Sequence, residues 1–150
     1  MRILVAYDGS PASDAALDEV IKRPWPAGSS VHIVSVVEWP IAFEPPFPAD
    51  YPGPAMDRVH EGQIEEGKRR VAAAKRRLSE RSDLTVTTDL REGSPKHALL
   101  DAIEEWKPDL TLAGSTGKTR LKRMLLGSVC HALVSHAPCN IEVVKLQPGK

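Results

Sequence analysis

Five short runs of apolar residues alternate along the chain with stretches in which apolar residues recur every three or four positions. The runs are ILVAY (3–7), VHIVSVV (31–37), LTVTTDL (84–90), DLTLAG (109–114) and NIEVVK (140–145). Their length and composition predict strands, and the periodic stretches between them predict helices. Parallel neighbours need crossover connections, so strands that alternate with helices predict a parallel sheet. Right-handed crossovers then favour an α/β, doubly wound, Rossmann-like sheet with helices on both faces.

Proline and serine mark where several helices begin. The sequence Gly-Ser-Pro occurs at 9–11 and again at 93–95. Ser10 and Ser94 are expected to cap the helices that follow, because a serine hydroxyl accepts a hydrogen bond from the first turn and proline suits the first helical position. A long helix is expected from Asp57 to about Arg81. Its apolar stripe consists of Ile64, Gly67, Val71, Ala74 and Leu78.

Length and charge restrict the possible partners. A chain of 150 residues predicts one domain, and 20 basic residues balance 20 acidic ones, so no overall field favours nucleic acid or a membrane. The basic stretches GKRR and KRR on the long helix are offset by glutamates and are interpreted as a solvated face. No apolar run approaches the roughly 18 residues of a spanning helix, and no signal peptide is recognised, so a cytoplasmic location is expected. Cys130 and Cys139 are expected to be reduced, largely buried thiols.

Residues 38–56 interrupt the regular pattern. This segment holds six of the 13 prolines and four of the seven aromatic residues, which excludes a regular helix or a central strand. We expect a partly packed flap. Its aromatic residues either fold over a ligand or plug the loop against the domain.

The sequence GSTGKT (114–119) follows the fourth run and ends like a phosphate-binding P-loop. A P-loop needs a glycine five positions before its Gly-Lys, and Leu112 stands there instead. A different spacing remains: Gly114, two residues, Gly117, nine residues, then Gly127-Ser128 at a helix start. Glycines let backbone N–H groups approach an anion, and a helix start favours phosphate. If the first and fourth strands are neighbours, this loop and the turn Asp8–Ser10 flank one crevice, so the full pattern favours a phosphate site over ordinary turns.

The spacing Gly-x2-Gly-x9-Gly-Ser resembles the nucleotide-binding signature of the universal stress protein family. ILVAYDGSPASDAAL resembles the first strand and turn of that family, and LLGSVCHALVSHAPCNIEVVK resembles its carboxyl-terminal segment. The resemblance covers essentially residues 1–150 as one domain, with 38–56 the least similar part. It implies a five-stranded parallel sheet of order 3-2-1-4-5 and ATP bound between strands one and four.

The resemblance also implies which residues contact the nucleotide. Asp8 would lie beside the ribose and adenine, with Ala6 and Tyr7 along the base. The backbone of Val36 would contact the adenine edge, and Ala113 would help to wall the base. Asp8 has two interpretations, a cap of the following turn or a ligand contact; its position at the carboxyl end of the first strand favours ligand contact.

The ribose and phosphates would be held mainly by backbone N–H groups and the Ser128 hydroxyl. The residues implied are Gly114, Ser115, Gly117, Lys118, Gly127, Ser128 and Val129. Mg²⁺ or Mn²⁺ commonly accompanies the phosphates in the family, and no metal ligands are assigned to the chain itself. Lys118 is equally well interpreted as a solvated loop charge. Thr116 and Arg120 depart from the family pattern, since many relatives carry a His or Arg and a Gly, respectively, at these positions.

Three functions are compatible with these features. The first is a regulatory module that binds ATP, or AMP or ADP, and changes its dimer or partner surfaces in the stress response. The second is a slow ATPase, for which no catalytic base is assigned; the third is a nucleotide-free protein-interaction domain. Family members are frequently homodimers joined through the last strand, and NIEVV offers an apolar edge for such pairing.

Overall fold

The structure, a computed structural model, describes residues 1–38, 53–117 and 126–146. The strands are β1 Arg2–Ala6, β2 Ser30–Val37, β3 Thr85–Glu92, β4 Leu110–Gly114 and β5 Asn140–Val144. The helices are α1 Pro11–Lys22, α2 Pro54–Leu78, α3 Pro95–Trp106 and α4 Ser128–His136. Most of the predicted flap, 39–52, lies outside the described residues. The long helix begins at Pro54 rather than Asp57, because proline suits the first helical position.

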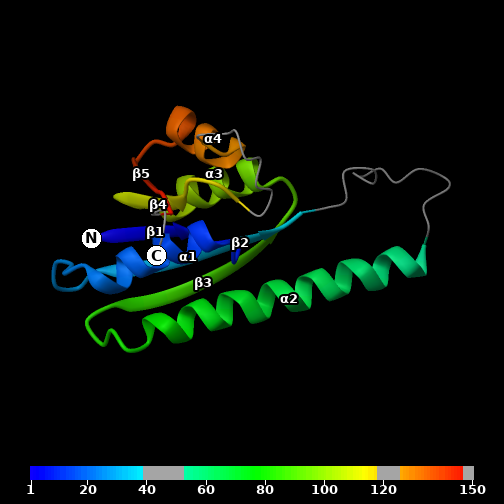
Figure 1. The fold of residues 1–150 in the computed structure, drawn as a ribbon, viewed down its shortest axis with the longest axis horizontal. Coiled ribbons are helices and arrows are strands. Elements are labelled where there is room, and N and C mark those ends of the chain that lie inside the picture. The colour runs from blue at the N-terminus through cyan, green and yellow to red at the C-terminus, as the bar shows by residue number, and fades with distance from the viewer. Residues whose placement is uncertain (39–52, 118–125, 147–150) are drawn as a thin grey trace.

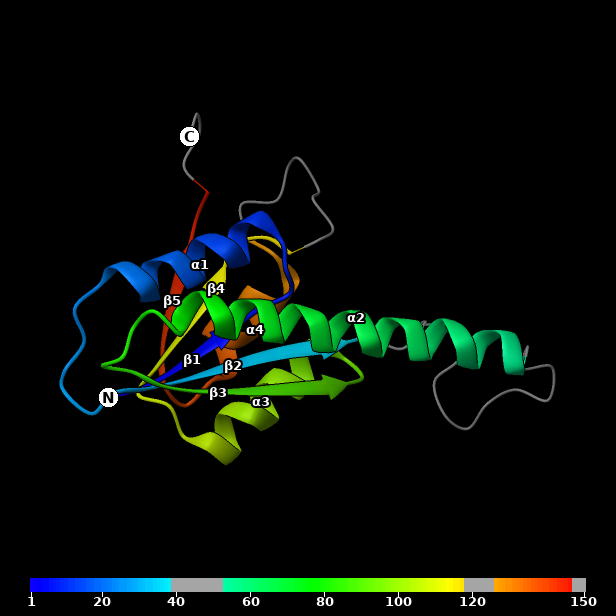
Figure 2. The same cartoon turned by 90° about the horizontal axis from the view of Figure 1, so that it is seen from below.

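The strands form one parallel sheet of order β3-β2-β1-β4-β5, which confirms the predicted fold class (Figure 1). Helices α1 and α2 cover one face, and α3 and α4 cover the other (Figures 1 and 2). Side chains of β1 alternate between the two cores. Ile3 and Val5 pack under α1 and α2, whereas Leu4 and Ala6 pack against α3 and α4. Burial on both faces explains why β1 is a continuous apolar run.

The central strand ends earlier than its neighbour β2. Pairing of β1 with β2 runs from Arg2 opposite Ser30 to Ala6 opposite Val34, and the Tyr7 N–H then donates to the Val34 carbonyl at 2.9 Å. Strand β2 continues for three more residues, where it is paired with β3. The first chain segment meanwhile turns away into α1. This divergence opens the sheet at the carboxyl ends of β1 and β2.

Helix α1 begins as expected, whereas α3 does so only in part. The Ser10 hydroxyl accepts a hydrogen bond from the Ser13 N–H at 3.2 Å, which confirms Ser10 as a cap. Ser94 occupies the cap position of α3, but its side chain makes no capping hydrogen bond, so that prediction is wrong. Sequence alone places a serine at a cap position; the hydroxyl's rotamer decides whether the bond forms.

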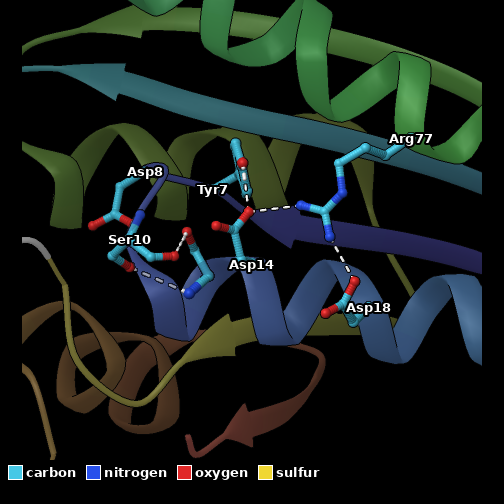
Figure 3. A network of polar contacts seen from close by, with 7 residues as sticks. Tyr7, Asp8, Ser10, Asp14, Asp18 and Arg77 are labelled. Carbon is cyan, nitrogen blue, oxygen red and sulfur yellow. Dashed lines mark hydrogen bonds and ion pairs between the residues drawn. The ribbon is translucent and has the colours of Figure 1, made fainter. Parts of the chain in front are cut away.

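Helix α2 runs along the sheet and extends beyond it at its amino-terminal end (Figures 1 and 2). Its predicted stripe is buried from Gly67 onward, and Ile64 is half-buried. Near its carboxyl end the Arg77 guanidinium donates to Asp14 at 2.7 Å and to Asp18 at 2.5 Å, both on α1 (Figure 3). This bridge fixes α2 against α1. None of the helices in the described residues is long and apolar enough to cross a membrane.

Candidate functional site

A cavity of about 710 Å³ lies at the carboxyl ends of β1, β2 and β4. Helices α2, α3 and α4 also contribute to its lining. The chain leaves β1 for one face of the sheet and reaches β4 from the other face, so the cavity lies at the reversal of strand order. Ligands of open parallel sheets bind at this position. The volume falls within the range of about 300–1,000 Å³ usual for small-molecule sites.

Ten of the twelve predicted site residues line this cavity. They are Ala6, Tyr7, Asp8, Val36, Ala113, Gly114, Gly117, Gly127, Ser128 and Val129. Ser115 does not line the cavity, and Lys118 lies outside the described residues, as does Arg120. The glycines of the spacing motif, three positions far apart in the sequence, therefore share one hollow.

The main chain of Val36 faces the gap left by β1. The Ser30 N–H donates to Met1 and the Val34 carbonyl accepts from Tyr7, so even-numbered residues of β2 turn their N–H and carbonyl groups toward β1. By the same alternation Val36, two residues beyond Val34, also turns its N–H and carbonyl groups toward β1. Within the described chain Val36 has no backbone hydrogen bond to β1. One donor and one acceptor are thus presented side by side at the cavity.

The walls near Val36 are apolar. Ala6 and Ala113 are neighbours on β1 and β4, and their side chains belong to the core cluster shared with α3 and α4. Leu99 of α3 lines the same side. Tyr7 also lines the cavity, but its ring packs in the opposite core and its hydroxyl donates to Asp14 at 2.8 Å (Figure 3). This part of the cavity is therefore apolar.

Asp8 follows β1 and both closes its turn and faces the glycine loop. Its Oδ1 accepts the Ser10 N–H at 2.9 Å, and Gly9 between them has a φ of +75°, which glycine tolerates best. A Cβ on Gly117 would lie 3.1 Å from Asp8 Oδ2. The two interpretations of Asp8, turn closure and ligand contact, are therefore compatible.

Gly114 is required by packing. A Cβ there would lie 2.5 Å from the carbonyl carbon of Ala12, in the first turn of α1.

The Gly114 carbonyl accepts a hydrogen bond from the Cys130 thiol at 2.8 Å. Burial, with a smaller contribution from the negative charge of Asp8, raises the pKa of Cys130 to about 11. Cys130 is buried and Cys139 half-buried, and both are free thiols.

Two backbone amides of residues predicted to contact the nucleotide already donate hydrogen bonds within the chain. The Ser115 N–H donates to the Val144 carbonyl at 2.8 Å, and the Gly127 N–H donates to the Ser115 carbonyl at 2.7 Å. Closing the loop uses both amides in this structure, whereas the assignment of Ser115 and Gly127 as site residues stays a prediction. The first amides of α4 differ, because its cap residue Gly127 supplies no side chain and the first turn has no acceptor within the helix. Ser128 and Val129, in this turn, line the cavity.

Helix α2 supplies a wall that sequence analysis missed. Val59, Gly62, Gln63, Glu66 and Arg70 line the cavity. Their spacing of three and four residues places them on one stripe beside the buried one, which is the signal that could have indicated them. The charged residues of the described lining are three carboxylates, those of Asp8, Glu38 and Glu66, and the Arg70 guanidinium. No set of three or more histidine, cysteine or acidic side chains suited to a metal ion occurs in the parts of the chain that the structure describes.

Comparison with known proteins assigns the family. Residues 1–145 match the family model described as the universal stress protein family. The chain belongs to this family. A curated member, universal stress protein MJ0531 of Methanocaldococcus jannaschii, is 30% identical over 144 residues, covering 96% of this chain and 81% of the relative.

Solved structures of other proteins share the fold. The structure of protein MJ0577 superposes with a TM-score of 0.83 at 23% identity, covering 99% of this chain and 97% of the other. A family protein from Arabidopsis thaliana with AMP bound has a TM-score of 0.70 at 14% identity, covering 99% and 93%. At these identities the likeness establishes the shared fold.

Proposed function

We propose that this universal stress protein binds an adenine nucleotide in the cavity and acts as a nucleotide-dependent regulatory module. The observation that carries the proposal is the continuity of one cavity from the main chain of Val36, past Asp8, to the first turn of α4. Such a cavity offers a base site, a sugar site and a phosphate site in the order in which a nucleotide needs them. AMP bound to the Arabidopsis protein of the same fold supports this interpretation.

The base would lie between the apolar walls, with its edge at Val36. Adenine presents an amino donor next to a ring-nitrogen acceptor, which matches the carbonyl and N–H that Val36 turns toward the gap. Ala6 and Ala113 leave room for the ring because their side chains are small. The Asp8 carboxylate would accept a hydrogen bond from a ribose hydroxyl, since a carboxylate is an acceptor only.

The phosphates would lie at the start of α4. The amides of Ser128 and Val129 point toward the helix amino end, where the macrodipole favours an anion. The excess of carboxylates among the described lining residues opposes a polyphosphate, so its charge needs neutralisation. A Mg²⁺ or Mn²⁺ ion carried on the phosphates would supply this, as would the side chain of Lys118 if it reaches them.

Binding is tested by titration calorimetry with ATP in the presence and absence of Mg²⁺. We expect binding that Mg²⁺ strengthens, because the ion offsets the acidic lining. Gly117→Val should weaken binding by about tenfold or more, since its side chain would occupy the space beside Asp8. Ala27→Val, which adds two of the same three carbons at an exposed turn outside the cavity, is the control. Absence of any binding heat at millimolar ATP would remove the proposal.

Two other functions stay open as alternatives. A slow ATPase would need an oriented water and charge neutralisation at the γ-phosphate. Phosphate release no faster than that of Gly117→Val would argue against it. A nucleotide-free interaction domain is distinguished by mass spectrometry of the gently denatured protein, because co-purifying ATP or AMP would count against it.

Homodimerisation through β5 and a cytoplasmic location remain predictions from the sequence. Strand β5 forms one edge of the sheet in the described structure, so its outer main-chain groups are available for pairing with a second copy. Sedimentation tests this: a single 16.4 kDa species at micromolar concentration would refute the dimer.

A further inference from the structure

A second hollow adjoins the candidate nucleotide cavity. It has a volume of about 630 Å³ and lies between α2 and the turn Asp8–Gly9. Asp8, Glu66 and Arg70 line both hollows, so the two meet at these side chains. The remaining lining comes from Arg69, Ala72, Ala73 and Arg76 of α2.

The lining of this second hollow is basic, and small residues leave space for an anion between its long side chains. Three guanidiniums face two carboxylates, which gives an excess of one positive charge. Small residues, Ala72, Ala73 and Gly9, separate the long side chains. Arg69 is paired with Glu66 at 3.0 Å, whereas Arg70 and Arg76 form no ion pair with the described residues. Two guanidiniums are therefore available to an anion at this position.

Arg70 is held at the junction of the hollows. Its Nη1 donates to the hydroxyl of Ser35, a buried residue of β2, at 3.1 Å. Its stem packs on the turn, because a Cβ on Gly9 would lie 3.2 Å from Arg70 Cδ. The neighbouring Arg77 points to α1, where Asp14 and Asp18 neutralise it (Figure 3). Arg70 is thus preorganised beside Asp8, and a guanidinium matches phosphate oxygens in geometry.

We propose that the second hollow is a subsite for a phosphate carried on the ribose of the bound adenine nucleotide, at its 2′ or 3′ oxygen. The inference rests on the proposed function, which places the sugar at Asp8. One ribose hydroxyl donates to Asp8, and the adjacent oxygen then faces the junction at Arg70. A phosphate on that oxygen extends among Arg70, Arg76 and Arg69. The preferred ligands are adenine nucleotides with a second phosphate on the sugar.

Two natural ligand classes share this chemistry. Coenzyme A and its derivatives carry a 3′-phosphate, and NADP carries a 2′-phosphate. The experiment therefore compares adenosine 5′-monophosphate with adenosine 3′,5′-bisphosphate and adenosine 2′,5′-bisphosphate, by calorimetry at one fixed low salt concentration. We expect one bisphosphate to bind about tenfold more tightly than the monophosphate, since hydrogen bonds between a guanidinium and a phosphate are charge-assisted and therefore strong. The favoured isomer identifies the class.

Substitutions separate the subsite from general attraction to positive charge. Arg76→Gln should bring the affinity ratio of bisphosphate to monophosphate close to one. Lys75→Gln is the matched control, because it removes the same charge from the adjacent position of α2 and lines neither hollow. Circular dichroism checks that both variants remain folded.

The outcomes are distinguishable. Monophosphate binding with no gain from either second phosphate would overturn the subsite while leaving the proposed function intact. An equal loss of the ratio in Lys75→Gln and Arg76→Gln would also overturn it, because the effect would then be unspecific. Failure of all three nucleotides to bind would overturn the proposed function, and the subsite with it.

Discussion

Alanine at position 114 should destabilise the protein, because the added methyl group has no room. The nearest atoms to a Cβ there are backbone atoms of Ala12 and Ser13, at 2.5–2.7 Å. Ordinary contacts begin near 3.4 Å, so α1 must move by almost 1 Å from β4. The start of α1 is fixed by the Ser10 cap, which opposes this movement.

The expected cost is about 3 kcal/mol, at the upper end of the range for overpacking. For a domain of this size that corresponds to a fall in melting temperature of roughly 6–12 °C. The measurement is thermal and urea unfolding of Gly114→Ala beside the wild type. Gly67→Ala should cost less, because the nearest atom to its Cβ is the end of the Leu90 side chain at 2.7 Å, which can rotate.

Gly62→Ala is the matched control. It lies inside α2 with nothing within 4 Å of the added Cβ, so it should raise stability by about 0.5–1 kcal/mol through helix propensity. A melting temperature for Gly114→Ala within about 2 °C of the wild type would refute the packing account, and the glycine would then have to be explained by its ligand alone.

Three further predictions concern stability. Ser10→Ala should lower the free energy of unfolding by about 1 kcal/mol in urea titrations, whereas Ser94→Ala should be nearly neutral, because only Ser10 makes the capping bond; equal losses would contradict this. Arg77→Gln should cost more than Arg69→Gln in the same assay, since Arg77 joins α1 to α2 and Arg69 pairs within its own helix; the reverse order would count against the bridge. Burial raises the pKa of Tyr7 to about 12 and that of Cys130 to about 11, so the stability that their protonated forms contribute is present below pH 9 and is lost as pH rises toward 11–12. Unfolding titrations from pH 8 to 11 should show this decline, and Tyr7→Phe should reduce it; an unchanged slope would contradict the assignment.

Much of the fold could be predicted from the sequence because strands that are buried on both faces of the sheet are continuous apolar runs in the sequence. The five apolar runs match the observed strands to within a residue or two, and the strand order expected from the family resemblance is the one found. The start of α2 was placed three residues late, because a proline-rich approach resembles a loop even where Pro54 occupies the first helical turn.

The candidate site was only partly predictable. The glycine spacing led to residues that share a cavity, but it could not show why each glycine is needed. Glycine is needed at position 114 because the first turn of α1 packs against it, and these two segments are about a hundred residues apart in the sequence. The amides of Ser115 and Gly127 are consumed by partners on β5 and on the loop itself. Arg70 was missed for the same reason, since its role depends on contacts with Ser35 and Gly9 rather than on its neighbours in sequence.

The hydrogen bond from the Gly127 N–H to the Ser115 carbonyl joins the end of β4 to the start of α4. Because it joins the two ends directly, this bond holds the first turn of α4 beside the carboxyl end of β4, where Ser128 and Val129 line the cavity.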